Sequence, residues 1–302
     1  MWFWLSLIAL LCWSGSDLFS KIGCRDPRDK FSPLKMVIAV GVVMGLHAAY
    51  EIFVGGTEIN LSILLTYLPV SLLYIGSMTL GYVGLRYIEL SISSPICNSS
   101  GALVAVMTLI FSGISGYSPL ALVAVALVCA GAIGLGVVDA CEDEDLRAVR
   151  QEASNYKYAK SAMALAMPVA YCLLDAAGTF ADNRVLETLN EDSANVAYEL
   201  TFLLAAVVCF VYVVLIKRTP LIPKLEAPKY IGAVCETAGQ FAYIYAIADT
   251  EHLAMSAPII SSYCAASVLW SRIFLKEKLS WKHYLMILLI IIGIAIMGFF
   301  DM

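Results

Sequence analysis

Charge is scarce in this chain of 302 residues. Only 14% of the side chains are charged, 61% are hydrophobic, and the mean hydropathy is +0.82. Soluble domains carry about 25% charged residues, so this composition excludes a soluble enzyme. Positive charges are scarcer than negative ones, with 19 Lys and Arg against 24 Asp and Glu and a net charge of −5. Because nucleic-acid binding needs clustered Lys and Arg, we expect no nucleic-acid partner.

The motifs of ATPases, hydrolases and metal sites are also missing. The sequence has no G-x-x-x-x-G-K-[ST] element, so we expect no ATP hydrolysis by this chain. Its three histidines lack metal-ligand spacing, and none of its nine cysteines forms a C-x-x-C pair. We therefore predict no metal, no other cofactor and no enzymatic activity, and interpret the cysteines as small core residues.

Long apolar runs fill most of the sequence. A helix that crosses the bilayer needs about 20 apolar residues, and the segments lack the period-two alternation of barrel strands. The sequence thus predicts an all-α polytopic membrane protein. Pro, Gly and charged residues divide the runs into ten segments, at about 2–23, 33–55, 65–88, 93–113, 119–139, 159–181, 194–216, 229–249, 254–274 and 281–300.

Basic residues test this division, because Lys and Arg concentrate in cytoplasmic loops. With ten helices, every Lys and Arg except Arg184 falls on one face of the membrane. One missed or added helix would place all later loops on the wrong face. We therefore predict ten transmembrane helices with both termini extracytoplasmic.

The two halves of the sequence resemble each other. At an offset of 163 residues, Leu90 matches Leu253 and the Pro95-Ile96 pair matches Pro258-Ile259. Five helices in each half reverse its orientation in the membrane, so the sequence predicts two inverted repeats that move around a central site. We place the first repeat at 1–139, an acidic cytoplasmic linker at 140–157 and the second repeat at 158–302.

Several short motifs resemble the EamA-like branch of the drug/metabolite transporter superfamily. They are Trp13-Ser14-Gly15-Ser16-Asp17, Leu85-Arg86-Tyr87, Ser94-Pro95 and Phe274-Leu275-Lys276-Glu277-Lys278-Leu279-Ser280. The corresponding stretch of the first half, Phe111–Ser118, lacks the acidic residue. The resemblance implies a secondary transporter with a cavity lined by the first, third and fourth helices of each half. It does not imply one substrate, because that superfamily handles amino acids, amines, sugars, nucleotide derivatives and drugs.

Two aspartates lie within the apolar segments, where an ionisable group is costly and therefore a functional candidate. Asp17 and Asp175 each lie very roughly 7 Å from the predicted midplane, Asp17 on the cytoplasmic side and Asp175 on the outer side. Both are candidates for proton coupling. For Asp17 the alternative is a structural pair with Lys21 one turn away.

The eighth segment has the most informative polar face. Glu236, Gln240 and Tyr243 follow one another at i, i+4 and i+7, so they share one side of a helix. A carboxyl group near the midplane can release a proton when it takes up a cation. We predict that all three residues bind substrate and that Glu236 also couples transport to protons. The alternative is a buried acid that a neighbouring hydroxyl satisfies.

Further candidates for substrate binding are Tyr74, Tyr82, Asn98 and Ser262. The tyrosines form an aromatic face on the third segment, and such faces attract ammonium groups. Asn98 and Ser262 lie at corresponding depths in the two halves, where helix-to-helix hydrogen bonding explains them equally well.

The sequence thus predicts a proton-coupled secondary active transporter of a small amino-containing or cationic metabolite, such as an amino acid, an amine or a quaternary ammonium compound. One alternative is a transporter of a neutral or anionic metabolite whose acids are structural, and another is a membrane scaffold or sensor. The expected partners are the substrate, protons and the lipid bilayer, with a homodimer as an option. We expect the plasma (inner) membrane as its location.

Overall fold

The structure is a bundle of long helices. This computed structural model describes the chain apart from residues 26–28, 89, 114–116, 142–161, 278 and 301–302, and the described part contains no strand. The helices are α1 (Trp2–Cys24), α2 (Ser32–Tyr50), η1 (Glu51–Gly55), α3 (Leu61–Tyr87), α4 (Leu90–Asn98), α5 (Ser100–Ser112), α6 (Pro119–Ala140), α8 (Ala162–Leu186), α9 (Glu191–Phe210), η2 (Val211–Ile216), α10 (Pro223–Ala248), α11 (Leu253–Ser261), α12 (Tyr263–Trp270), η3 (Ser271–Leu275) and α13 (Trp281–Phe300).

Each predicted apolar segment coincides with helix, and two segments are interrupted. The fourth consists of α4 and α5, which meet at Ser99, and the ninth consists of α11, α12 and η3, with a break at Ser262. By length and composition, eight helices in the described chain could cross a membrane. The other two long helices, α8 and α10, carry the acids Asp175 and Glu236, so a crossing by all ten stays a prediction.

Local sequence explains where several helices begin and end. The side chain of Asn60 accepts a hydrogen bond from the Ile63 amide at the start of α3, and Asn190 accepts one from the Asp192 amide at the start of α9. Both satisfy amides that lack a partner inside the helix. Gly56 ends the α2–η1 segment in a left-handed conformation that glycine adopts readily.

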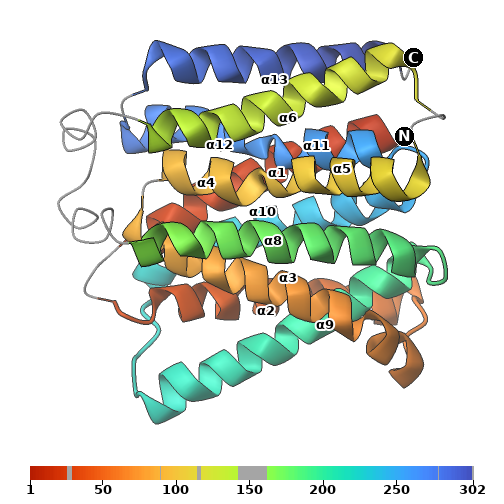
Figure 1. Cartoon of the computed structure of the whole chain (residues 1–302). Helices are drawn as coiled ribbons and strands as arrows, with labels where there is room; N and C mark the ends of the chain where they lie inside the picture. The colour runs from red at the N-terminus through yellow and green to blue at the C-terminus, as the bar shows by residue number, and fades with distance from the viewer. Residues whose placement is uncertain (26–28, 89, 114–116, 142–161, 278, 301–302) are drawn as a thin grey trace.

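The helices pack as long side-by-side pairs. α1 lies along α10, α3 along α8, α2 along α9, and α6 along α13. In Figure 1 the α6–α13 pair forms one side of the bundle and α9 the other, with α1, α4, α5, α8 and α10 between them. α1 begins at the end of the bundle where α13 ends (Figure 1). The predicted linker, 140–157, lies outside the described residues from 142 onward.

Glycines set the distance between α6 and α13. A Cβ atom on Gly293 would lie 2.6 Å from Val128 Cγ2 and 2.8 Å from the Ala124 carbonyl oxygen. One on Gly134 would meet the sulfur of Met286, the end region of a flexible side chain. A backbone atom therefore excludes a side chain at position 293, whereas the side chain that Gly134 faces can move away.

Replacing Gly293 by Ala is expected to destabilise the protein by about 1–3 kcal/mol, because the added methyl group overpacks a rigid contact. Thermal unfolding of the detergent-purified protein measures this as a lower midpoint. The Gly134→Ala variant is the matched control and should stay close to wild type, since Met286 can rotate away. Equal midpoints for the two variants would contradict this account of the α6–α13 contact.

Candidate functional site

A cavity lies among the central helices. Nine helices of the described chain contribute to its wall: α1, α3, α4, α5, α8, α9, α10, α11 and α12. The lining residues are Trp13, Ser16, Asp17, Ser20, Tyr74, Met78, Gly81, Tyr82, Leu85, Ser93, Ser94, Cys97, Asn98, Gly101, Val104, Tyr171, Asp175, Thr179, Tyr198, Glu236, Gln240, Tyr243, Ala257, Ile260, Ser261 and Tyr263.

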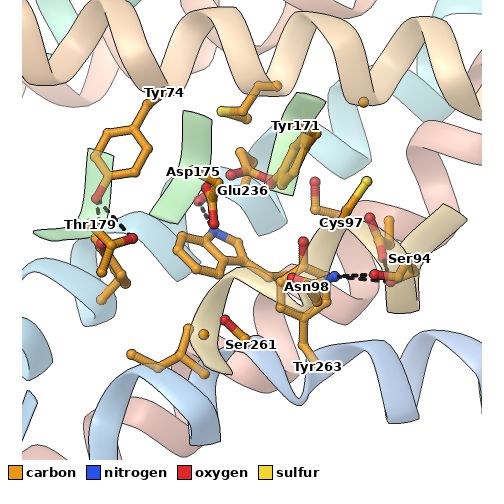
Figure 2. A pocket seen from close by; sticks show the side chains of 18 of the residues that line it. Tyr74, Ser94, Cys97, Asn98, Tyr171, Asp175, Thr179, Glu236, Ser261 and Tyr263 are labelled. Carbon is orange, nitrogen blue, oxygen red and sulfur yellow. Dashed lines mark hydrogen bonds between the residues drawn. The ribbon is translucent and has the colours of Figure 1, made fainter. Parts of the chain in front are cut away.

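Three carboxyl groups face this cavity. They belong to Asp17 on α1, Asp175 on α8 and Glu236 on α10. Both aspartates lie close enough to Glu236 to repel its charge. Figure 2 shows Asp175 and Glu236 near each other, beside Tyr171. No Lys, Arg or His belongs to the lining of the cavity within the described chain, so the negative charges have no basic partner there.

Hydroxyl groups hold each acid in place. Asp17 accepts hydrogen bonds from Ser94 Oγ at 2.5 Å and Ser267 Oγ at 2.8 Å. Asp175 accepts one from Ser100 Oγ at 2.7 Å, and Ser16 is hydrogen-bonded to Glu236. Serine hydroxyls position the acids without neutralising them, so the carboxyl groups can still exchange protons or cations.

The structural alternative for Asp17, an ion pair with Lys21, does not match the contacts of these two side chains. Lys21 directs its ammonium group to the carbonyl oxygens of Leu85, at 3.0 Å, and Ile88, at 2.8 Å. These carbonyls lie at the end of α3, where a helix leaves its last carbonyls without partners in the helix. Lys21 thus anchors the end of α3, while Asp17 faces the cavity with its two serine donors.

Aromatic side chains form much of the remaining wall. The ring of Trp13 lies 4.9 Å from that of Tyr243 and 5.8 Å from that of Tyr263, measured between centroids. The hydroxyl groups of Tyr74 and Tyr243 are hydrogen-bonded to each other, and the hydroxyl groups of Tyr243 and Thr179 form a hydrogen bond of 3.0 Å. Aromatic faces beside carboxylates suit an organic cation, which both groups attract.

The broken helices bring polar groups to the cavity. Asn98, just before the break at Ser99, donates its Nδ2 to the Ser94 carbonyl at 2.8 Å, as Figure 2 shows. Past this break, α5 crosses α11 at Gly101, where a Cβ atom would lie 2.4 Å from Ser261 Oγ and 2.7 Å from the Ala257 carbonyl oxygen. Glycine at 101 therefore allows the two interrupted segments to meet at the cavity wall.

The structure brings most of the predicted site residues together. Asp17, Asp175, Glu236, Gln240, Tyr243, Tyr74, Tyr82 and Asn98 all line the cavity. Ser262 does not belong to this lining: it is buried, and its hydroxyl donates to the Ile259 carbonyl at 2.5 Å. Its neighbour Ser261 lines the cavity instead, because the helix breaks at Ser262.

The buried acid Asp182 was not predicted. Asp182 is fully buried and accepts hydrogen bonds from Tyr67 at 2.8 Å and Tyr74 at 3.2 Å. The predicted sixth segment ends at residue 181, whereas α8 continues to Leu186. The spacing of Asp175 and Asp182, i and i+7, places them on one helix face and could have revealed the second acid. Through Tyr74, Asp182 is joined to the wall of the cavity.

Four aromatic wall residues were also absent from the prediction. Trp13, Tyr171, Tyr198 and Tyr263 come from four different helices, and no spacing within a segment links them. In the described part of the chain, no group of three or more His, Cys, Asp and Glu side chains could hold a metal ion.

Comparisons with known proteins relate this chain to one transporter family. Residues 164–299 match the EamA-like transporter family. No curated protein matches the sequence. Among solved structures 27 chains match. One of them, described as the crystal structure of a protein, is 14% identical, with a TM-score of 0.63 over 98% of this chain and 96% of that chain. This structural likeness concerns the fold alone.

Proposed function

We propose that the protein is a secondary active transporter of a small amino-containing or cationic metabolite, coupled to protons. Residues 164–299 match the EamA-like transporter family, and eight helices of the described chain could cross a membrane. The observation that carries the proposal is the cavity with three carboxyl groups, an aromatic wall and no basic side chain in its described lining. Such a site attracts cations and repels anions.

The carboxyl groups also give the proposed coupling a physical basis. A buried carboxyl group favours its neutral, protonated form unless a positive charge stands beside it. A cationic substrate at Glu236 supplies that charge and displaces the proton, and substrate release allows the proton to return. Asp17 and Asp175 can take part in the same exchange because their carboxyl groups line the same cavity.

Helix packing supports the proposed inverted repeats, 1–139 and 158–302. The repeat relates α1 to α8 and α3 to α10, so a pseudo-two-fold axis converts the α1–α10 contact into the α8–α3 contact. Both contacts are extensive. The contacts of α2 with α9 and of α6 with α13 are extensive too, and the same axis maps each of these two contacts onto itself. This symmetry suits alternating access, in which one repeat moves against the other around the central cavity.

We place the transporter in the plasma membrane with both termini outside, because the distribution of Lys and Arg favours that orientation. A homodimer stays a prediction. The glycines of α6 and α13 pack against other helices of the same chain, for example Gly131 against Ile290 and Gly298 against Phe3, whereas Ala130 and Ala295 on these helices are exposed.

A binding panel tests this function. Thermal stabilisation of the detergent-purified protein is measured with amines, quaternary ammonium compounds, amino acids, sugars and carboxylates, at pH 6 and pH 8. A ligand at 100-fold excess over its Kd adds about 2.7 kcal/mol of stability. We expect a cation to stabilise more at pH 8, where fewer protons compete for the carboxyl groups. Stabilisation only by sugars or carboxylates, and equal at the two pH values, would contradict the proposal and give the acids a structural role.

A further inference from the structure

Three hydrogen-bond donors in the cavity wall lack partners. They are Gln240 Nε2, the Tyr82 hydroxyl and the Ser20 hydroxyl, and each atom is buried with no hydrogen bond in the described structure. The residues are only 3%, 6% and 1% exposed. Buried donors in folded proteins are nearly always paired, so such exceptions need an explanation.

These donors are grouped around Glu236. Gln240 lies one helical turn beyond Glu236 on α10. Ser20 lies one turn beyond Ser16 on α1, and Ser16 is hydrogen-bonded to Glu236. Tyr82, on α3, lines the same cavity as Glu236. Since one turn spans about 5.4 Å, a small molecule whose cation rests at Glu236 can reach donors on either side of it.

The charge of the wall limits which acceptor these donors can receive. A substrate carboxylate would meet three protein carboxyl groups, and the described lining offers no Lys, Arg or His to balance it. Burying an unpaired charge is far costlier than burying a neutral polar group. A hydroxyl, amide or ester oxygen accepts a hydrogen bond without adding negative charge, and therefore suits these donors.

We propose that the substrate is an organic cation that also carries an uncharged oxygen acceptor, as in an amino alcohol or an amino amide. The three unpartnered donors around Glu236 select it over a plain alkylamine, which has no acceptor, and over a zwitterionic amino acid, which has a charged one. This inference rests on the proposed function and narrows its substrate class.

Four ligands with one carbon skeleton test this specificity. Leucinol carries the ammonium and the hydroxyl, 4-methylpentan-2-amine lacks the hydroxyl, leucine has a carboxylate in its place, and 4-methylpentan-1-ol lacks the amine. A two-carbon set follows the same logic: ethanolamine, ethylamine, glycine and ethanol. Dissociation constants are measured at pH 8 by calorimetry on the full-length protein in detergent.

We expect the amino alcohol to bind about tenfold more tightly than the matching amine, as one hydrogen bond to a buried donor allows, and the amino acid to bind most weakly. The ratio of amine to amino alcohol dissociation constants should fall towards one in the Gln240→Met and Tyr82→Phe variants, which remove a donor but keep the volume. Thr79→Val is the matched control, because the Thr79 hydroxyl already donates to the Ile75 carbonyl of its own helix and lies outside the described lining of the cavity.

The other outcomes separate the two proposals. Equal binding of amine and amino alcohol, tightest binding of the amino acid, or an unchanged ratio in both cavity variants would overturn the inference while leaving a cation transporter in place. Neutral alcohols that bind as tightly as the amino alcohols, or no binding by either set, would contradict the proposed function and the inference together.

Discussion

Replacing Glu236 by Gln is expected to abolish substrate-driven proton movement while the protein still folds. Glutamine has nearly the same shape and can keep the hydrogen bond with Ser16, but it cannot exchange a proton. In proteoliposomes with an internal pH-sensitive dye, adding a cation that binds the wild type should change the internal pH only in wild-type vesicles. The variant should give the signal of empty liposomes.

Glu199→Gln is the matched control for this experiment. Glu199 is a fully buried acid of α9, but it is hydrogen-bonded to His47 at 2.8 Å and is outside the described lining of the cavity. Its replacement should leave the proton signal in place. If the Glu236→Gln variant transports protons as the wild type does, Glu236 has no part in coupling, and the role passes to Asp17 or Asp175.

Replacing Glu226 by Gln should destabilise the fold by about 3–5 kcal/mol, because it leaves a buried cation without its partner. Glu226 Oε2 lies 2.7 Å from Lys229 Nζ, and its Oε1 lies 3.3 Å from Lys35 Nζ; all three side chains are at most 5% exposed. These contacts join the start of α10 to the start of α2. Thermal unfolding in detergent measures the loss.

Two further variants test whether the loss of stability comes from burial of the charges or from the loss of any ion pair. Glu187→Gln breaks the pair with Arg184, whose atoms lie 2.8 Å apart but whose side chains are nearly half exposed. It should cost at most about 1 kcal/mol. The double variant Glu226→Gln with Lys229→Met removes both charges and should be more stable than Glu226→Gln alone. If Glu187→Gln and Glu226→Gln are equally destabilising, burial does not explain the effect.

The sequence predicted the helices well because lipid imposes a simple rule on them. A segment that satisfies its backbone hydrogen bonds in an apolar medium must be helical over about 20 residues, and the runs of apolar residues mark such segments. The same regularity placed Glu236, Gln240 and Tyr243 on one face of α10. All three line the cavity, because α10 is unbroken between them.

The remaining parts of the site depend on features that helix periodicity does not contain. At the break between α11 and α12, the Ser262 hydroxyl donates to the Ile259 carbonyl of α11, and Ser261 lines the cavity instead. Asp182 lies beyond the last apolar residue of its segment, where composition no longer indicates a helix. Trp13 and Tyr171 meet the site through packing between helices distant in sequence, which a single sequence does not specify.

The crossing of α5 and α11 has a consequence for how this protein can evolve. Gly101 is confined by two kinds of neighbour, the hydroxyl of Ser261 and the main-chain oxygen of Ala257. A mutation to glycine at 261 would remove the first obstacle but not the second, since every residue at 257 has a carbonyl. No single compensating substitution can therefore admit a side chain at 101. A smaller residue at 261 would keep the crossing and change the local shape and polarity of the cavity, whereas a side chain at position 101 is excluded for as long as this crossing is kept.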